Sequence, residues 1–422
     1  MSKYSAMVHN VKLPKMALVR QRFDREILED IPGEIRKQLE RPEITETIKP
    51  GMSIGITGGS RGVANIALIL REIASFIKEK GAQPFIFPAM GSHGGATAEG
   101  QQAILTSYGI TEEYCGCPIR ATMETKDIGY TDEGHIVQID KYAAEADGFI
   151  AVNRIKPHTA FRGPYESGLM KMLTIGVGKQ RGAEVTHTAG FGEMHHLVPL
   201  FGKAIMKHSN LLFGVSTIEN AYDDTYRIDA LTPEEIVTEE PKLLLIAKAK
   251  MGSILFAETD LLVIDEIGKN ISGDGADPNV SGRFIGPYAT GGIKSQRVVT
   301  LALTEESHGS AAGVGVFDAV SKRLYDQTDF EVTYPNAITN TVLLTVKMPI
   351  VMDNDRDTIA VGVKSCNGID YNNPRIIRIK NTAHIEDIYI SETLMKEAEA
   401  NPDITIVRGP EPFAFNDDGN LW

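Results

Sequence analysis

Short apolar runs alternate with glycine-rich turns and amphipathic stretches in the first half of the chain. Residues 52–57 (MSIGIT) form an apolar run that ends in glycines. The apolar positions that follow recur at helical spacing: Val63, Ile66, Ala67, Leu70, Ile73, Ala74 and Ile77. Two further apolar runs cover residues 84–90 and 147–153, and a helix is predicted to begin near Thr97. This succession of strand, loop and helix predicts an α/β domain with a mostly parallel sheet.

The second half of the chain continues the alternation. Helices are predicted at residues 195–208 and 241–251, and a strand at residues 210–218. Residues 260–265 (DLLVID) form another strand that opens into a glycine-rich loop, residues 268–283. This length suits two domains. We expect domains at residues 1–255 and 256–422, each with a mostly parallel or mixed sheet flanked by helices, and an active site in the cleft between them.

Three polar loops follow the first three predicted strands, at residues 58–62, 91–95 and 154–162. Ligands of parallel sheets bind beyond the carboxyl ends of the strands. Because these loops are rich in glycine, histidine and arginine, the sequence predicts that they converge on one site.

Composition limits the classes of partner. The 422 residues carry a net charge of −13, which disfavours nucleic-acid binding but leaves room for a local anion pocket. We expect no signal peptide, no membrane span, a cytoplasmic protein and possibly a homo-oligomer. The chain has three cysteines, too few for a disulfide scaffold; Cys115 and Cys117 are predicted to be ordinary surface or half-buried thiols.

The loops carry candidate acid–base and anion-binding groups. His93 lies between glycines and suits either acid–base work or the capping of the next helix. The segment 154–163 (RIKPHTAFRG) gathers Lys156, His158 and Arg162, which favours an anion site over a solvated basic loop. Arg61 could meet an anion at a helix start. The GVGK segment at residues 176–179 lacks the spacing of a phosphate loop.

Taken together, these segments resemble the lactate racemase family that carries a nickel-pincer nucleotide. The shared order is an arginine turn after the first strand, GxH after the second, PH after the third, then a lysine and a histidine. The resemblance covers about residues 50–210. Its most specific part is residues 155–183 (IKPHTAFRGPYESGLMKMLTIGVGKQRGA), which resemble a racemase-like subgroup of unknown substrate.

The resemblance implies a racemase or epimerase that removes hydride from the α-carbon of a small anionic 2-hydroxy acid and returns it to the other face. It implies that His93 and His158 act as acid and base. It further implies roles in holding the nickel cofactor and the substrate, with Lys171 joined to the cofactor, His187 bound to nickel, Gly58, Gly59 and Ser60 near the cofactor, and Arg61, Arg162 and Lys156 on the substrate.

The sequence also departs from that family. Gly58 stands where the family usually has aspartate, Gly94 where it has arginine, and the gap between His158 and Lys171 is longer. Lys179 or Lys156 could therefore replace Lys171 as the cofactor lysine. Two alternatives stay open: a nickel-independent isomerase or lyase of a sugar acid on the same scaffold, and a non-catalytic protein that binds an anionic metabolite. The loop at residues 268–283 is either a lid or a surface loop.

Overall fold

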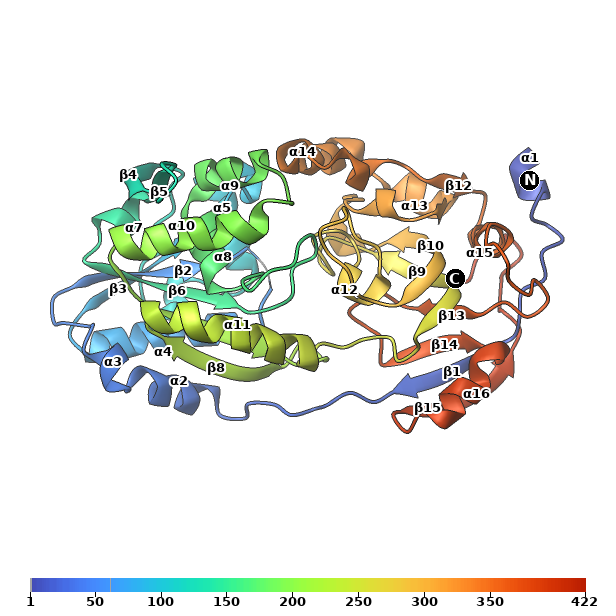
Figure 1. Cartoon of the computed structure of the whole chain (residues 1–422), viewed down its shortest axis with the longest axis horizontal. Coiled ribbons are helices and arrows are strands. Elements are labelled where there is room, and N and C mark those ends of the chain that lie inside the picture. The colour runs from blue at the N-terminus through green and yellow to red at the C-terminus, as the bar shows by residue number, and fades with distance from the viewer. Residues whose placement is uncertain (1, 61) are drawn as a thin grey trace. The chain divides into compact units, whose positions relative to one another are not determined.

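The computed structural model describes residues 2–60 and 62–422. The chain divides into two compact units (Figure 1). The first unit is Arg25–Met251, and the second unit combines Met1–Asp24 with Gly252–Trp422. Both are α/β, as predicted. The location of the active site in a cleft between them stays a prediction.

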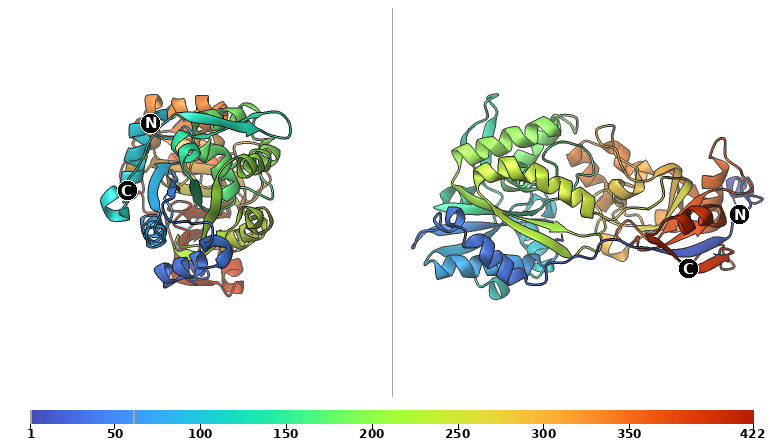
Figure 2. Two further views of the ribbon diagram at one scale, coloured as in Figure 1. Left: turned by 90° about the vertical axis from the view of Figure 1, so that its left-hand side faces the viewer. Right: turned by 60° about the horizontal axis from the view of Figure 1, so that its bottom comes forward.

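The first unit is built on a five-stranded sheet in the order β3-β2-β6-β7-β8. The first four strands in this order run parallel, and β8 is an antiparallel edge strand. The bounds are β2 Ser53–Gly58, β3 Gln83–Pro88, β6 Gly148–Arg154, β7 Leu211–Glu219 and β8 Thr225–Leu231. A separate hairpin, β4 Thr125–Tyr130 and β5 Ile136–Asp140, stands out from the body of this unit (Figure 2).

Alternating side chains give this sheet two apolar faces. Phe149 of β6 packs into the core beneath α10 (Met194–His208) and α11 (Pro233–Lys250). Its neighbour Ile150 packs into the core beneath α4 (Ile66–Glu79). In β3, Phe87 packs into the same core as Phe149, and Ile86 packs into the same core as Ile150. A parallel sheet buried on both faces needs apolar residues at every position, which is why its strands read as continuous apolar runs.

Helices cover both faces of the sheet. Their bounds are α2 Ile31–Leu39, α3 Pro42–Thr45, α4 Ile66–Glu79, α5 Ala98–Ser107, α6 Glu112–Cys115, α7 Lys141–Glu145, α8 Leu169–Lys171, α9 Lys179–Thr188, α10 Met194–His208 and α11 Pro233–Lys250. A 3-10 turn, η1 Gly94–Ala96, precedes α5, and a π-helical segment, η2 Met172–Val177, joins α8 to α9. Isolated π-helical turns often accompany functional sites.

Helix α11 begins eight residues before the start predicted at Pro241. A capping box between Thr232 and Glu235 starts it earlier. Pro241 lies inside the helix although proline cannot donate to the carbonyl of Val237. The hydroxyl of Tyr165 donates to that carbonyl instead, at 2.7 Å. A tertiary contact thus replaces the missing helical hydrogen bond.

The second unit contains an eight-stranded mixed sheet in the order β12-β11-β10-β9-β13-β14-β1-β15. The bounds are β1 Met16–Gln21, β9 Glu258–Ile267, β10 Lys294–Leu303, β11 Ala319–Ser321, β12 Ile350–Met352, β13 Ile376–Ile379, β14 Asp387–Ser391 and β15 Ile404–Glu411. The first five strands in this order are parallel, and the remaining pairings are antiparallel. The helices are α1 Lys3–Ala6, α12 Pro278–Ser281, α13 Lys322–Gln327, α14 Phe330–Asn340, α15 Asp355–Lys364 and α16 Met395–Ala400, with 3-10 turns η3 Glu305–Ser307, η4 Val314–Val316, η5 Leu343–Val346 and η6 Glu392–Leu394.

The start of the chain lies in the second unit, whereas sequence analysis assigned all of residues 1–255 to the first domain. Strand β1 pairs with β14 on one side and β15 on the other. Residues 1–24 therefore complete a sheet whose other strands come from the end of the chain. The chain passes from the first unit to the second after Met251, close to the predicted domain boundary at residue 255.

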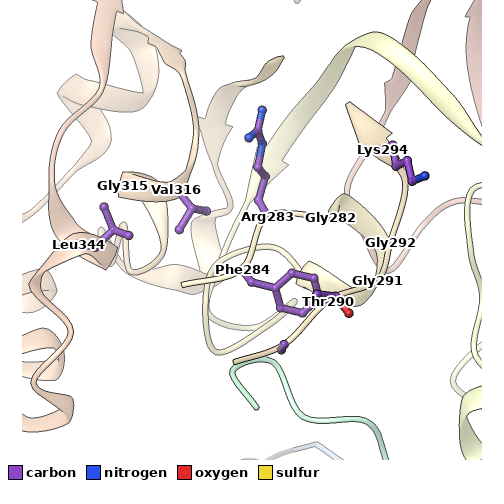
Figure 3. A pocket seen from close by; sticks show the side chains of 11 residues that line it. Gly282, Arg283, Phe284, Thr290, Gly291, Gly292, Lys294, Gly315, Val316 and Leu344 are labelled. Atoms are coloured by element: carbon purple, nitrogen blue, oxygen red, sulfur yellow. The ribbon is translucent and has the colours of Figure 1, made fainter. Parts of the chain in front are cut away.

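The glycine-rich loop at residues 268–283 is held within the second unit. Asp277 caps α12, and its backbone N–H donates to Thr382 Oγ1 at 2.8 Å. Beyond the loop lies a cavity of about 770 Å³ whose wall includes Arg283, Phe284 and Lys294. The Arg283 side chain points away from Phe284 (Figure 3) and forms a 2.8 Å ion pair with Asp318. This pairing already neutralises the Arg283 charge.

The cysteines differ from expectation in their burial. Cys115 and Cys117 are only 2% and 4% exposed and belong to the core beneath α4, so the prediction of surface or half-buried thiols was wrong. Both thiols are free, as is that of Cys366. None of the helices in the described part of the chain is long and apolar enough to cross a membrane.

Candidate active site

Three loops meet at the carboxyl edge of the first unit's parallel sheet. They follow β2, β3 and β6, and they carry Ser60, His93 and His158. The backbone N–H of Ala89 donates to the carbonyl of Gly58 at 2.8 Å, which joins the first two loops at their base. Arg61, the predicted substrate anchor, lies outside the described residues.

His158 and Lys171 are in direct contact. The Nε2 atom of His158 lies 2.9 Å from Nζ of Lys171, and its Nδ1 atom accepts the N–H of Ala160 at 3.0 Å. Because Nδ1 is an acceptor, a neutral His158 carries its proton on Nε2. The Lys171 nitrogen is then the acceptor of that proton, which requires a neutral amine. A neutral amine is the form of lysine that can make a covalent bond to an electrophile.

The loop that carries His158 is held by Glu166, a residue that sequence analysis missed. The Glu166 side chain is fully buried and accepts the backbone N–H of His158 at 2.8 Å. Lys248 of α11 donates to the same carboxylate at 2.6 Å. Arg162 contacts Glu166 at 3.3 Å and donates to the carbonyl of His158 at 2.6 Å. Arg162 therefore braces this loop, and its predicted contact with substrate stays a prediction.

A second unforeseen carboxylate supports Lys171. Glu240 of α11 is 1% exposed and accepts the backbone N–H of Met170 at 3.0 Å, at the start of α8. Burial raises the pKa of Glu240 to about 8, against the lowering effect of the N–H groups of Met170 and Leu169. A Cβ at Gly168 would lie 2.1 Å from Glu240 Oε1. Only glycine at 168 lets this carboxyl group reach the helix start.

His187 lies on α9 with one ring nitrogen already engaged. Its Nδ1 atom is 2.6 Å from the carbonyl oxygen of Ala183, so Nδ1 carries the proton and Nε2 keeps its lone pair. Burial lowers the pKa of His187, although the hydrogen bond to the carbonyl of Ala183 acts in the opposite direction. A neutral imidazole held by a backbone carbonyl is the usual form of a metal ligand.

Phe191 links the two histidines. Its ring centre lies 6.2 Å from that of His158 and 5.8 Å from that of His187. The structure thus places His158 and His187 beside one aromatic ring and Lys171 against His158, although the three residues come from a loop, α8 and α9. Among the described residues no three histidine, cysteine, aspartate or glutamate side chains could hold a metal together.

The His93 loop packs beside these elements. The N–H of Gly91 donates to the carbonyl of Gly176 in η2 at 3.4 Å. A Cβ at Gly94 would lie 2.6 Å from the backbone nitrogen of Gln101, so glycine at 94 permits the close approach of α5 rather than of a ligand. Thr97, not His93, caps α5 through its side chain.

Gly58 ends β2 and Gly59 follows it, and the two glycines have different surroundings. Gly58 is buried, and a Cβ there would lie 2.6 Å from Leu105 Cδ2, so the packing of α5 accounts for this glycine by itself. Gly59 and Ser60 are half-buried; a Cβ at Gly59 would approach the methyl group of Met172 at 3.4 Å. Gly59 is therefore adjacent to the residue that follows Lys171. The predicted cofactor contacts of Gly58, Gly59 and Ser60 stay predictions.

The alternative lysines have different surroundings. Lys179 is completely buried and forms a 2.9 Å ion pair with Asp140, which is equally buried. Lys156 pairs through its backbone with Ser167, at 2.8 and 3.1 Å. The side chain of Lys171 contacts His158, with Nζ 2.9 Å from Nε2. Its position makes it the best candidate for the cofactor lysine.

The fold and this cluster define an α/β protein with titratable side chains gathered beyond the carboxyl ends of a parallel sheet. Residues 12–196 match the family described as the lactate racemase N-terminal domain. This region of the chain is similar to the N-terminal domain of the lactate racemases. No curated protein matches the chain in sequence.

Two solved structures match the chain at low sequence identity. The apoprotein of the lactate racemase from Thermoanaerobacterium thermosaccharolyticum matches with a TM-score of 0.52 and 14% identity, over 87% of this chain and 94% of that one. A structural-genomics protein from Thermotoga maritima matches with a TM-score of 0.49 and 11% identity, over 84% of this chain and 97% of that one. The first likeness supports the two-domain α/β architecture.

Proposed function

We propose that the protein is a racemase or epimerase of small 2-hydroxy acids that works with a nickel-pincer nucleotide. The observation that carries the proposal is the cluster of His158, Lys171 and His187, with Lys171 2.9 Å from His158. The match of residues 12–196 to the lactate racemase N-terminal domain supports a racemase-type activity. The substrate and the cofactor are part of the proposal.

The residues of the cluster suit this cofactor. His187 offers a neutral Nε2 lone pair to nickel, because Ala183 holds Nδ1. Lys171, whose Nζ contacts His158 Nε2 at 2.9 Å, would as a neutral amine make the covalent link to the nucleotide. When bound, the group would supply the acceptor and donor of hydride for the α-carbon.

The chain's own residues would handle the proton and the carboxylate. His93 and His158 follow β3 and β6, the strands on either side of β2, and each would take or give the hydroxyl proton on one face of the substrate. Glu166 holds the backbone of His158, which fixes the ring that exchanges the proton. Arg61 would anchor the carboxylate, and Arg162 or Lys156 would contact a second polar group of a longer acid.

The test is intact-protein mass spectrometry with metal analysis, on protein made in a host that synthesises the cofactor. We expect a covalent adduct that disappears in Lys171→Ala and persists in Lys156→Ala. We expect nickel to be lost in His187→Ala and retained in His195→Ala. His195 is a fair control because its Nδ1 contacts the carbonyl oxygen of Gly192 at 2.8 Å while its side chain is exposed.

An unmodified mass without nickel in that host would refute the cofactor assignment. The His158–Lys171 pair would then favour the alternative, a nickel-independent isomerase or lyase of a sugar acid, because a neutral amine beside an imidazole can work as an acid–base pair without metal. A screen of hydroxy acids and sugar acids for turnover would distinguish that enzyme from a protein that only binds an anionic metabolite.

A further inference from the structure

Lys179 is a buried cation that the proposed reaction does not use. Its side chain is completely buried, and its backbone has a φ of 56°, in the left-handed region that favours glycine. Burial lowers the pKa of Lys179 and raises that of Asp140, while each charge opposes the effect on the other. A buried cation in an unfavourable backbone conformation is costly for a residue that serves only to fill the core.

The Lys179 ammonium has three oxygen neighbours, two of which accept hydrogen bonds and one of which is its ion-pair partner. They are the carbonyl of Pro88 at the end of β3, Gln101 Oε1 at 3.1 Å and Asp140 Oδ2 at 2.9 Å. A lysine cation can only donate, so the Gln101 amide must turn its oxygen toward Nζ. The orientation of this buried amide therefore depends on the lysine.

The other end of the Gln101 amide faces the His93 loop. Its Nε2 donates to the carbonyl of Gly91 at 2.9 Å and to the carbonyl of His93 at 3.3 Å. Gly91, Gly94 and Gly95 all have positive φ values, so the backbone of this loop has little conformational preference of its own. The hydrogen bonds from Gln101 therefore add to those within the loop in selecting its conformation.

We propose that Lys179 and Gln101 are positioning residues that hold His93 in place through the carbonyls of Gly91 and His93. The proposal rests on the proposed function of His93 as an acid–base group. A shift of about 1 Å in such a group is enough to lower turnover strongly. The proposal also gives a role to the GVGK segment at residues 176–179. Its lysine, Lys179, orients the side-chain amide of Gln101 instead of binding phosphate.

The first test does not depend on catalysis. Gln101→Met removes both hydrogen bonds to the loop at similar side-chain length, and Gln102→Met is the matched control at the exposed neighbouring position. Hydrogen–deuterium exchange would be measured at residues 91–96 and, as an internal reference, in α4. We expect roughly tenfold faster exchange in the loop of Gln101→Met, with α4 unchanged and the control like the wild type. Native exchange in the loop of Gln101→Met would overturn the proposal.

Should Gln101→Met fail to fold, Gln101→Glu is the second variant. A carboxylate keeps the contact with Lys179 but cannot donate to the two carbonyls, so the loop should again exchange faster. Unchanged exchange in this variant would likewise refute the coupling.

The second test uses the holoenzyme with a 2-hydroxy acid that it racemises. Misplacement of His93 should lower kcat roughly 10- to 100-fold in Gln101→Met and leave KM nearly unchanged. Faster loop exchange with wild-type kcat would refute the positioning role of Gln101. A wild-type protein without turnover would instead count against the proposed function, and the exchange result would still decide whether Lys179 and Gln101 fix the loop.

Discussion

Replacing Glu240 by glutamine tests the ionisation of the buried carboxyl group behind Lys171. The pKa of Glu240 rises from 4.5 to about 8 on folding because the side chain is removed from water. Between these values the folded chain holds a proton that the unfolded chain has lost. Stability therefore falls as pH rises through this window and is level on either side of it.

Each unit of pKa corresponds to about 1.4 kcal/mol, so the full change is at most on the order of 5 kcal/mol. Glutamine cannot ionise, and its carbonyl can still accept the N–H of Met170. We expect Glu240→Gln and the wild type to be similarly stable near pH 5. Near pH 8 the variant should be more stable, by roughly 2–4 kcal/mol if some of the penalty is relieved by relaxation.

The assay is urea unfolding followed by far-ultraviolet circular dichroism at several values of pH. Fluorescence of Trp422, the single tryptophan, reports separately on the second unit. Glu234→Gln, at an exposed position of the same helix, controls for the loss of a carboxylate. Parallel stability profiles of Glu240→Gln and the wild type across this range would refute the reasoning, because they would mean that Glu240 is ionised in the folded protein.

Three further predictions concern packing, the thiols and His187. Gly58→Ala should destabilise the first unit by about 1–3 kcal/mol in thermal unfolding, because the new Cβ would lie 2.6 Å from Leu105 Cδ2. The control Gly59→Ala should be tolerated, because its Cβ would lie 3.4 Å from the nearest atom. Equal melting temperatures of the two variants would contradict the packing argument. Thiol reagents should react slowly with the native protein and rapidly with the protein unfolded in urea. Burial raises the pKa of Cys117 and of Cys366 to about 11, and it also raises the pKa of Cys115. Fast labelling of the native protein would show that the three thiols are not buried. The NMR titration of His187 should have its midpoint below 6.5, since burial disfavours the imidazolium, and a higher midpoint would exclude the neutral ligand form near neutral pH.

Local periodicity was enough to predict the parallel strands of the first unit. The apolar runs at residues 52–57, 84–90 and 147–153 became β2, β3 and β6 within a few residues. The start of α5 was also predictable, because Thr97 is a good capping residue and its side chain accepts the N–H of Gly100 at 3.1 Å. These features depend on neighbours in sequence, which a single sequence displays directly.

Long-range pairing escaped sequence analysis. Strand β1 belongs to the second unit because its partners β14 and β15 lie at the opposite end of the chain. Pro241 sits inside α11 because Tyr165, distant in sequence, hydrogen-bonds the carbonyl that proline leaves unpaired. The roles of Glu166 and Glu240 were equally hidden, since nothing in the local sequence distinguishes a buried carboxylate from an exposed one.

The sequence by itself determined the α/β alternation, the family resemblance and the residue types at the site. The tertiary structure decided which of these residues meet. It brings Lys171 to His158 and buries Lys179 against Asp140, although both lysines lie in the same short stretch. The physical reason is that Lys171 ends α8 and Lys179 begins α9, so the helical twist between them points the two side chains in different directions. Burial and hydrogen-bond partners, and with them the protonation states on which the chemistry depends, exist only once the chain is folded.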